Sequence, residues 1–260
     1  MKSTRCKTSD ARTSRSLRGR MRATLWAFAL LLIGTTGGVQ ASHYAGTDII
    51  VDWLGGENYR FTQKVYRDCA GITLGTTTLV NLTPAIPVSS VTLTRSSLID
   101  ITPLCPGQLS RCASASGAFG IEEHIYIGVV SNLAPNTNYR VDANQLCCRN
   151  AAITTVTNAG SQQLYIYSNF RTGIQNSSPR FLNRPFGVFC ANQAATLSPN
   201  GFDPDGDAIV YSIQSCYDLN ASDPVTYAPG FSGLNPLNSS TGVSINPNTG
   251  TLSFTPTVVN

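Results

Sequence analysis

The stretch GFDPDGDAIVYSIQS (residues 201–215), followed by TGVSINPNTGTLSFTP (residues 241–256), decides the fold class of this sequence. An acidic turn leads into the alternating segment Ala208 to Ser215, and Asn248-Thr249-Gly250 separates two later apolar runs. Alternation of apolar and polar residues is typical of a half-buried strand, and Asn and Gly favour tight hairpin turns. The order turn, strand, turn, strand predicts an all-β domain.

The same pattern extends toward the N-terminus. Tyr59, Phe61 and Val65 are expected on one face of a strand, with Lys64 and Tyr66 on the other. No segment shows a convincing helical period, and short strands separated by turn residues indicate a sandwich. The predicted strands are Asp48 to Trp53, Asn58 to Tyr66, Thr76 to Leu82, Ser90 to Arg95, His124 to Val130, Asn138 to Asn144, Gln163 to Ser168, Phe186 to Ala191, Ala208 to Ser215, Val243 to Ile245 and Leu252 to Phe254.

A break in the pattern divides the chain into two parts. The segment Gly173 to Arg184, which contains Asn176-Ser177-Ser178-Pro179, has the composition of a linker. We therefore predict two tandem β-sandwich domains, residues 42–180 and 181–260. The second is shorter than the ~100 residues of an immunoglobulin-like sandwich, so we expect it to be incomplete at its C-terminus.

The N-terminus has the features of an export signal. Residues 1–22 are strongly basic, Leu25 to Ile33 form an uncharged apolar run, and Val39-Gln40-Ala41 offers small residues for cleavage. The run is shorter than the ~20 residues that span a bilayer. We predict a signal peptide over residues 1–41 and a secreted or cell-surface protein that is not an integral membrane protein after cleavage.

The charge balance changes once this signal is removed. Residues 1–41 hold eight of the eighteen basic residues and one of the fourteen acidic ones, which leaves ten basic and thirteen acidic residues, a net charge of −3. Nucleic-acid binding requires a basic patch on the folded domain. We therefore expect no nucleic-acid partner.

Seven cysteines follow the signal and, in an exported chain, are interpreted first as disulfides. Cys105 and Cys112 close a short loop and form one candidate pair. Cys190 and Cys216 are the only cysteines of the second predicted domain and form another. Cys69 is then expected to bond Cys147 or Cys148, which leaves one thiol unpaired.

Catalytic chemistry finds little support. Glu122 and His124 share a strand face, since side chains alternate with period two, whereas Glu123 points the other way. Glu122 and His124 could form a catalytic carboxylate–imidazole dyad, or they could simply be polar residues at the start of a strand. We favour the second interpretation. The sequence after the signal has no phosphate-binding loop, HExxH motif or nucleophile elbow. We predict that the protein is not an enzyme.

Several motifs together resemble a known family. They are Ser42-His43-Tyr44-Ala45-Gly46, Tyr59-Arg60-Phe61, Val65-Tyr66-Arg67-Asp68-Cys69, Cys147-Cys148-Arg149-Asn150, Asn176-Ser177-Ser178-Pro179 and Asp203-Pro204-Asp205-Gly206-Asp207. In order and spacing they are similar to the N-terminal region of gliding-motility-associated or PKD-domain-containing surface proteins exported by the type IX secretion system. The second unit also resembles an immunoglobulin-like or cadherin-like domain.

Asp203, Asp205 and Asp207 are the candidate metal ligands. Calcium prefers six to eight oxygen ligands, and a turn at Pro204-Gly206 would bring the three carboxylates together. The resemblance favours calcium, whereas a solvated turn explains the same residues without a metal. Calcium is the only cofactor expected.

The function expected from these observations is a non-catalytic structural, adhesion or interaction role at the cell surface, associated with gliding motility. Its expected partners are other surface proteins or polysaccharide. The alternative is an accessory region of a larger secreted hydrolase that positions the catalytic domain or binds carbohydrate. Tyr165 and Tyr167, on one strand face, could stack on a sugar or pack on a neighbouring sheet.

Overall fold

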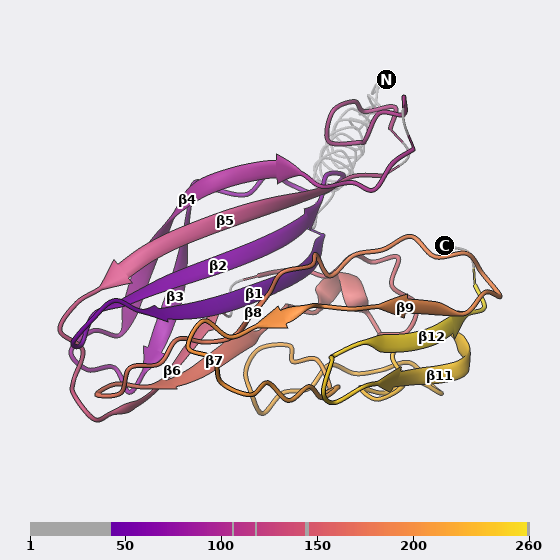
Figure 1. Ribbon diagram of the computed structural model, residues 1–260. Helices are drawn as coiled ribbons and strands as arrows, with labels where there is room; N and C mark the ends of the chain where they lie inside the picture. Colours follow the sequence, from indigo (N-terminus) through magenta and orange to yellow (C-terminus); the bar gives the residue numbers. More distant parts are fainter. Residues whose placement is uncertain (1–42, 106, 118, 144–145, 259–260) are drawn as a thin grey trace, which may run out of the picture. The chain divides into compact units, whose positions relative to one another are not determined.

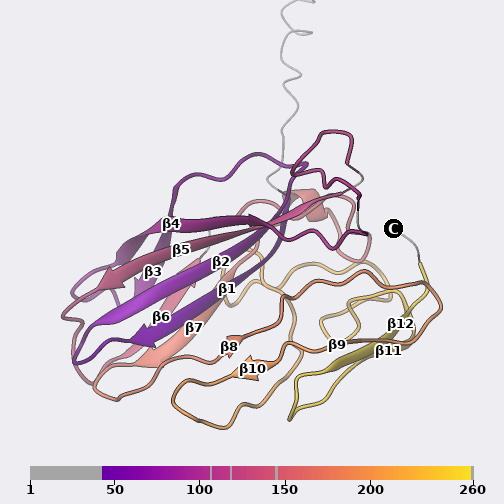
Figure 2. The same ribbon diagram turned by 45° about the horizontal axis from the view of Figure 1, so that its top comes forward.

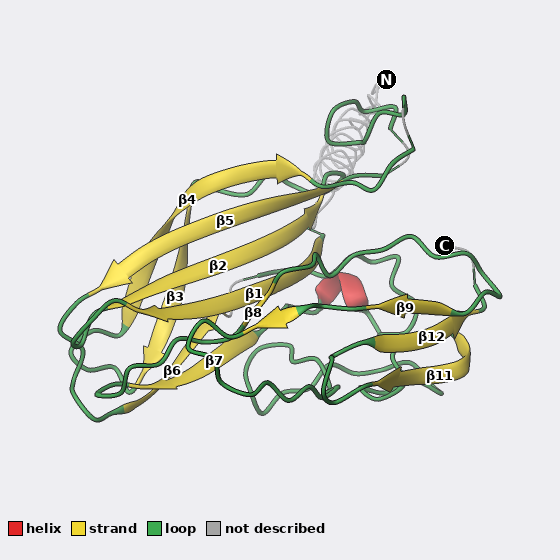
Figure 3. Ribbon diagram, in the orientation of Figure 1, coloured by secondary structure: helices red, strands yellow, loops and turns green. Residues whose placement is uncertain are grey.

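The computed structural model describes residues 43–105, 107–117, 119–143 and 146–258, and the predicted signal peptide lies outside them. The described chain is all-β, with one short 3-10 helix, η1 (Ala159–Ser161) (Figures 1 and 3). The described residues form one compact unit. Within the described ranges, no helix has the length and apolar character needed to cross a membrane.

A seven-stranded antiparallel sheet dominates the structure. Its strands are β1 (Tyr44–Trp53), β2 (Tyr59–Asp68), β3 (Thr77–Thr83), β4 (Ser90–Asp100), β5 (Ile121–Val130), β6 (Asn138–Ala143) and β7 (Ile166–Arg171). Their order in the sheet is β1-β2-β5-β4-β3-β6-β7. The two end strands, β1 and β7, also contact each other, so the sheet curls until it is nearly closed like a barrel (Figure 2).

The alternation in β2 explains how this sheet forms its core. Tyr59 and Phe61 are fully buried and Val65 is 1% exposed, as the sequence predicts. Burying aromatic and branched side chains on the inner face supplies the hydrophobic free energy that holds the curled sheet. Tyr66 points the other way but is also buried, because Phe186 packs edge-on against it with ring centroids 4.8 Å apart. The chain after residue 180 therefore covers part of the sheet's outer face.

Glycines form two hairpin turns, of which the one at Gly250 confirms the turn predicted at Asn248-Thr249-Gly250. Gly55 and Gly56 adopt positive φ angles of 104° and 54° between β1 and β2, a conformation that glycine adopts without steric cost. Gly250, with φ of 71°, performs the same role between β11 (Ser239–Ile245) and β12 (Leu252–Pro256).

The remaining strands are short. β8 (Arg180–Phe181) pairs with β10 (Gly201–Phe202), and β9 (Ala195–Leu197) joins β11 and β12 in a sheet of order β11-β12-β9. Two tandem sandwiches are not confirmed: the structure has one large curled sheet and these two small ones.

Two predicted strands are wrong. Phe186 to Ala191 and Ala208 to Ser215 are not strands in the structure. An alternating sequence can only become a strand when a neighbour supplies ladder hydrogen bonds. In the second segment, Tyr211 N–H donates to the Pro247 carbonyl over 2.9 Å, but no ladder continues from it.

Candidate functional site

A cluster of polar side chains lies at one end of strands β2 and β5. Antiparallel pairing places Arg67 opposite Glu122 and Val65 opposite His124. Glu122 and His124 share a strand face, as the sequence predicts, and His124 Nε2 lies 2.7 Å from Glu122 Oε1. Arg67 Nη1 donates to the same carboxylate oxygen. The side chains of Arg67 and Glu122 are 6% and 13% exposed, so water screens this ion pair weakly.

The contacts of His124 define its protonation state. Its Nδ1 lies 3.3 Å from Arg95 Nη1, and a guanidinium can only donate, so Nδ1 is the acceptor. Nε2 therefore carries the proton and donates to Glu122. Burial lowers the pKa of His124, and although Glu122 opposes this effect, the pKa remains below its usual value. The imidazole is neutral and completely buried, which suits a structural hydrogen-bond bridge.

A disulfide between Cys69 and Cys112 closes over this cluster, with the Cα atoms 5.0 Å apart. Cys69 N–H donates to the Gly120 carbonyl over 2.9 Å, which brings the loop between β4 and β5 against the end of β2. A Cβ atom at Gly120 would lie 2.7 Å from Cys112 Sγ, so glycine permits this approach. The predicted Cys105–Cys112 pair is therefore corrected, since Cys105 is free and exposed.

The other predicted pairs are corrected as well. Cys190 and Cys216 are both free and exposed. Cys216 accepts a backbone hydrogen bond from Val225, whereas Cys190 lies on the segment leading to β9, so the two belong to separate loops. Cys147 and Cys148 form a disulfide with each other and neither bonds Cys69.

Asp100 anchors the loop that carries Cys112. Its Oδ1 accepts the backbone N–H of Thr102 over 3.0 Å, and its Oδ2 accepts the hydroxyl of Ser110. Burial alone raises the pKa of Asp100, but these hydrogen bonds outweigh it and lower that pKa overall. The ionised carboxylate therefore ties the start of the loop to its middle.

The three aspartates of the acidic turn have hydrogen-bonding roles in the structure. Asp203 Oδ1 accepts the N–H groups of Asp205 and Asp207 over 2.9 and 3.2 Å. Asp205 Oδ2 accepts the N–H of Ser177 over 2.6 Å. Among the described residues, the one group of three acidic, cysteine or histidine side chains whose ligand atoms converge within 4.8 Å is Cys69, Cys112 and Glu122. Calcium at the acidic turn stays a prediction.

Sequence reasoning missed the role of the segment Asn176 to Pro179. Ser178 Oγ accepts the N–H of Val51 over 2.6 Å, and Ser177 Oγ accepts that of Trp53 over 3.2 Å. The segment that looks like a linker thus caps the edge of β1 and also binds the acidic turn. Its serines are the one signal that could have indicated this, because their hydroxyls can replace a ladder partner.

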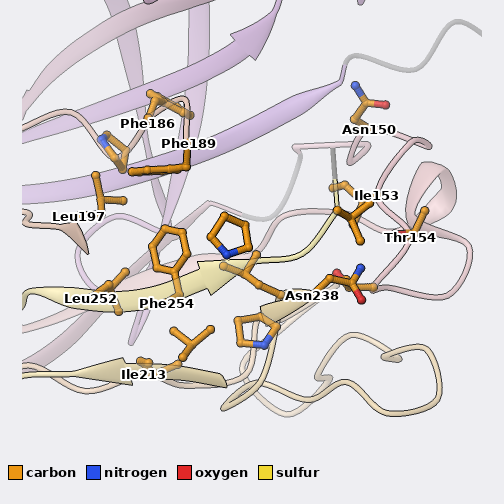
Figure 4. A pocket seen from close by; sticks show the side chains of 18 of the residues that line it. Asn150, Ile153, Thr154, Phe186, Phe189, Leu197, Ile213, Asn238, Leu252 and Phe254 are labelled. Carbon is orange, nitrogen blue, oxygen red and sulfur yellow. The ribbon is translucent and has the colours of Figure 1, made fainter. Parts of the chain in front are cut away.

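An apolar groove lies between the loop at residues 150–155 and the β9-β12-β11 sheet (Figure 4). Its volume is about 750 Å³. Phe189 and Phe254 meet edge to face in it with ring centroids 5.0 Å apart, and Leu197, Leu252 and Ile213 extend the apolar wall. The sequence predicts the strand that carries Leu252 and Phe254, but neither β9 nor the groove.

Tyr165 and Tyr167 form a packed aromatic cluster. Their ring centroids lie 6.4 and 6.2 Å from that of Tyr217, and the guanidinium of Arg140 lies 4.5 Å from the Tyr167 ring centroid. Of the two interpretations of these tyrosines, packing on a neighbouring segment is the one that the structure supports.

Comparison of the chain with protein-family models, with curated proteins and with solved structures finds no match. The resemblance to gliding-motility-associated surface proteins therefore stays a prediction from the quoted motifs.

Proposed function

We propose that this protein is a non-catalytic secreted or cell-surface protein that binds a partner polypeptide in a structural or adhesive role. The proposal includes the association with gliding motility and type IX export that the sequence motifs indicate. Calcium at Asp203, Asp205 and Asp207 belongs to the same proposal, as a means of stiffening the acidic turn.

The single observation that carries this proposal is the apolar groove. Soluble proteins rarely expose large contiguous apolar surfaces, and those that do commonly use them for recognition. Groove residues Leu237 and Val258 are 41% and 46% exposed. Burying such side chains against a partner yields roughly 25 cal/mol per Å² of apolar area. An apolar lining favours a polypeptide over a polysaccharide among the expected partners.

The buried cluster supports a non-catalytic role. Substrate protons must come within hydrogen-bond reach of a general base. The polar atoms of His124 face Glu122, Arg95 and Tyr126, and its side chain is completely buried. A substrate could reach the imidazole only after local opening of the sheet.

The test is a bead-retention assay. Beads coated with the purified protein are passed over a layer of surface proteins extracted from the source cells, and retention under flow is measured. We expect Leu237→Glu and Val258→Glu to reduce retention, because each places a charge in the groove. Val129→Glu is the matched control, since Val129 is 56% exposed on β5 and does not line the groove. Equal retention of all four proteins would refute the groove as the binding surface.

A further inference from the structure

The disulfide and the buried cluster together have the composition of a metal centre. Cys69 directly follows β2, Glu122 is the second residue of β5, and Cys112 lies in the loop that joins β4 to β5. The two sulfur atoms and a carboxylate oxygen of Glu122 all lie within 4.8 Å of one another. Cysteine thiolates and carboxylates are ligands that Zn²⁺ and similar divalent cations bind.

The carboxylate of Glu122 is oriented as a ligand. Its Oε1 is occupied by His124 and Arg67, whereas Oε2 lies 3.7 Å from Cys69 Sγ. Metal-ligating side chains are commonly held by such hydrogen bonds from a second layer of residues, which fix their direction. Because His124 is fully buried, the orientation is built into the core of the sheet.

We propose that Cys69, Cys112 and Glu122 bind a thiophilic divalent cation, of which zinc is the representative, when the Cys69–Cys112 disulfide is reduced. The reductant is a dithiol: it transfers two electrons and two protons to the disulfide, which becomes two thiols, and is itself oxidised to a disulfide. The cation then displaces the two thiol protons, which pass to water. The proposal is independent of the proposed binding role of the groove.

The charges of this arrangement balance. Two thiolates and the Glu122 carboxylate carry three negative charges, and a divalent cation with Arg67 supplies three positive ones. Uncompensated buried charge is strongly unfavourable, so this neutrality favours binding at a partly buried site. Three protein ligands leave a fourth tetrahedral position for water.

Cys69 and Cys112 cannot form their disulfide and bind the cation at the same time. A disulfide has no thiolate to offer, so oxidation excludes the cation and the bound cation blocks disulfide formation. Occupancy of the site therefore depends on the redox state of Cys69 and Cys112. Cys105, in the same loop, is free and exposed and provides a matched control.

The first test is a titration with Co²⁺ alone, under argon, of protein reduced with a dithiol that is then removed. We expect thiolate-to-cobalt charge-transfer absorption that is absent from the oxidised protein. It should disappear in Cys69→Ser and Cys112→Ser and persist in Cys105→Ser. Glu122→Gln should weaken binding by about tenfold or more. Absorption of equal strength in Cys112→Ser, or none in the reduced protein, would overturn the proposal.

A second measurement needs no substitution and so avoids variants that fail to fold. Reduced wild-type protein is alkylated with iodoacetamide with and without Zn²⁺, and the rate at each cysteine is followed by mass spectrometry. We expect Zn²⁺ to slow alkylation of Cys69 and Cys112 by at least about tenfold and to leave Cys105 unchanged. Unchanged rates at Cys69 and Cys112 would contradict the site.

Discussion

Arg180 Nη2 lies 2.6 Å from Asp52 Oδ1, although the two residues are 128 positions apart in the chain. The other oxygen of Asp52 accepts from Arg60 Nη2 over 2.8 Å, so one carboxylate joins two guanidinium groups. The Asp52 side chain is 9% exposed. This bridge fastens the start of β8 to the edge strand of the large sheet.

Replacing Arg180 with alanine should therefore lower the free energy of unfolding. A hydrogen bond to a charged group contributes about 1.5–3 kcal/mol, and partial exposure of Arg180 reduces this, so we expect a loss of roughly 1–2 kcal/mol. Urea unfolding followed by tryptophan fluorescence measures it. Arg184→Ala is the control, because Arg184 is 51% exposed and lies 3.9 Å from Glu123 Oε2. Equal losses in both variants would contradict the role of the bridge.

Replacing Ser178 with alanine should leave the backbone N–H of Val51 open to solvent. The Val51 N–H loses its acceptor, which is the Ser178 hydroxyl at 2.6 Å, so its amide should exchange with solvent faster. The amide of Phe61 lies in β2 between two paired strands and should not change. Hydrogen exchange measured by NMR separates the two amides. Acceleration at both would indicate general loosening of the sheet instead.

The acidic turn allows a test that separates hydrogen bonding from calcium binding. Asp203→Asn retains an oxygen that accepts the N–H groups of Asp205 and Asp207, whereas Asp203→Ala loses both bonds and should cost about 1–2 kcal/mol. Melting temperature is compared for both variants in millimolar calcium and in chelator. If hydrogen bonding is the whole role, calcium has no effect. A rise with calcium that Asp203→Asn abolishes would establish the predicted site.

Asp48 makes stability depend on pH. Burial raises the pKa of Asp48, and this effect outweighs the opposing effects of Lys64 and the Tyr66 hydroxyl. The folded state then binds this proton more tightly than the unfolded state, so stability is lost as pH rises through the raised pKa. Asp48→Asn should therefore raise the melting temperature at neutral pH. The gain should vanish below the pKa of about 3.9 in the unfolded chain. A gain that does not change with pH would exclude ionisation as the cause.

The Cys69–Cys112 disulfide can be distinguished from the predicted Cys105–Cys112 pair by peptide mapping. Trypsin cleavage after Arg67, Arg95, Arg111 and Arg140 places the three cysteines on separate peptides. We expect the unreduced digest to link residues 68–95 to residues 112–140. A link between residues 96–111 and 112–140 would instead support the sequence-based pairing.

Local rules in the sequence predict the local structure of the large sheet, but they fail for Phe186 to Ala191 and Ala208 to Ser215, which are not strands. Period-two alternation correctly places Tyr59 and Phe61 in the core and Glu122 beside His124. Disulfide pairing is different, because it depends on where a long loop returns. Cys112 reaches Cys69 only because β5 pairs with β2. The spacing of the cysteines along the chain does not reveal that these two strands are neighbours. The apolar groove is equally non-local, since its walls come from segments far apart in sequence.

The hydroxyl groups of Ser177 and Ser178 have a consequence for behaviour at high concentration. A strand edge with free N–H and C=O groups is a template on which further chains can add, and this is how ordered fibrils grow. The serine hydroxyls accept the backbone N–H groups of Val51 and Trp53 on the outer edge of β1. Two donors that an incoming strand would need are therefore already hydrogen-bonded. A protein displayed densely on a surface would in this way resist self-assembly through its largest sheet.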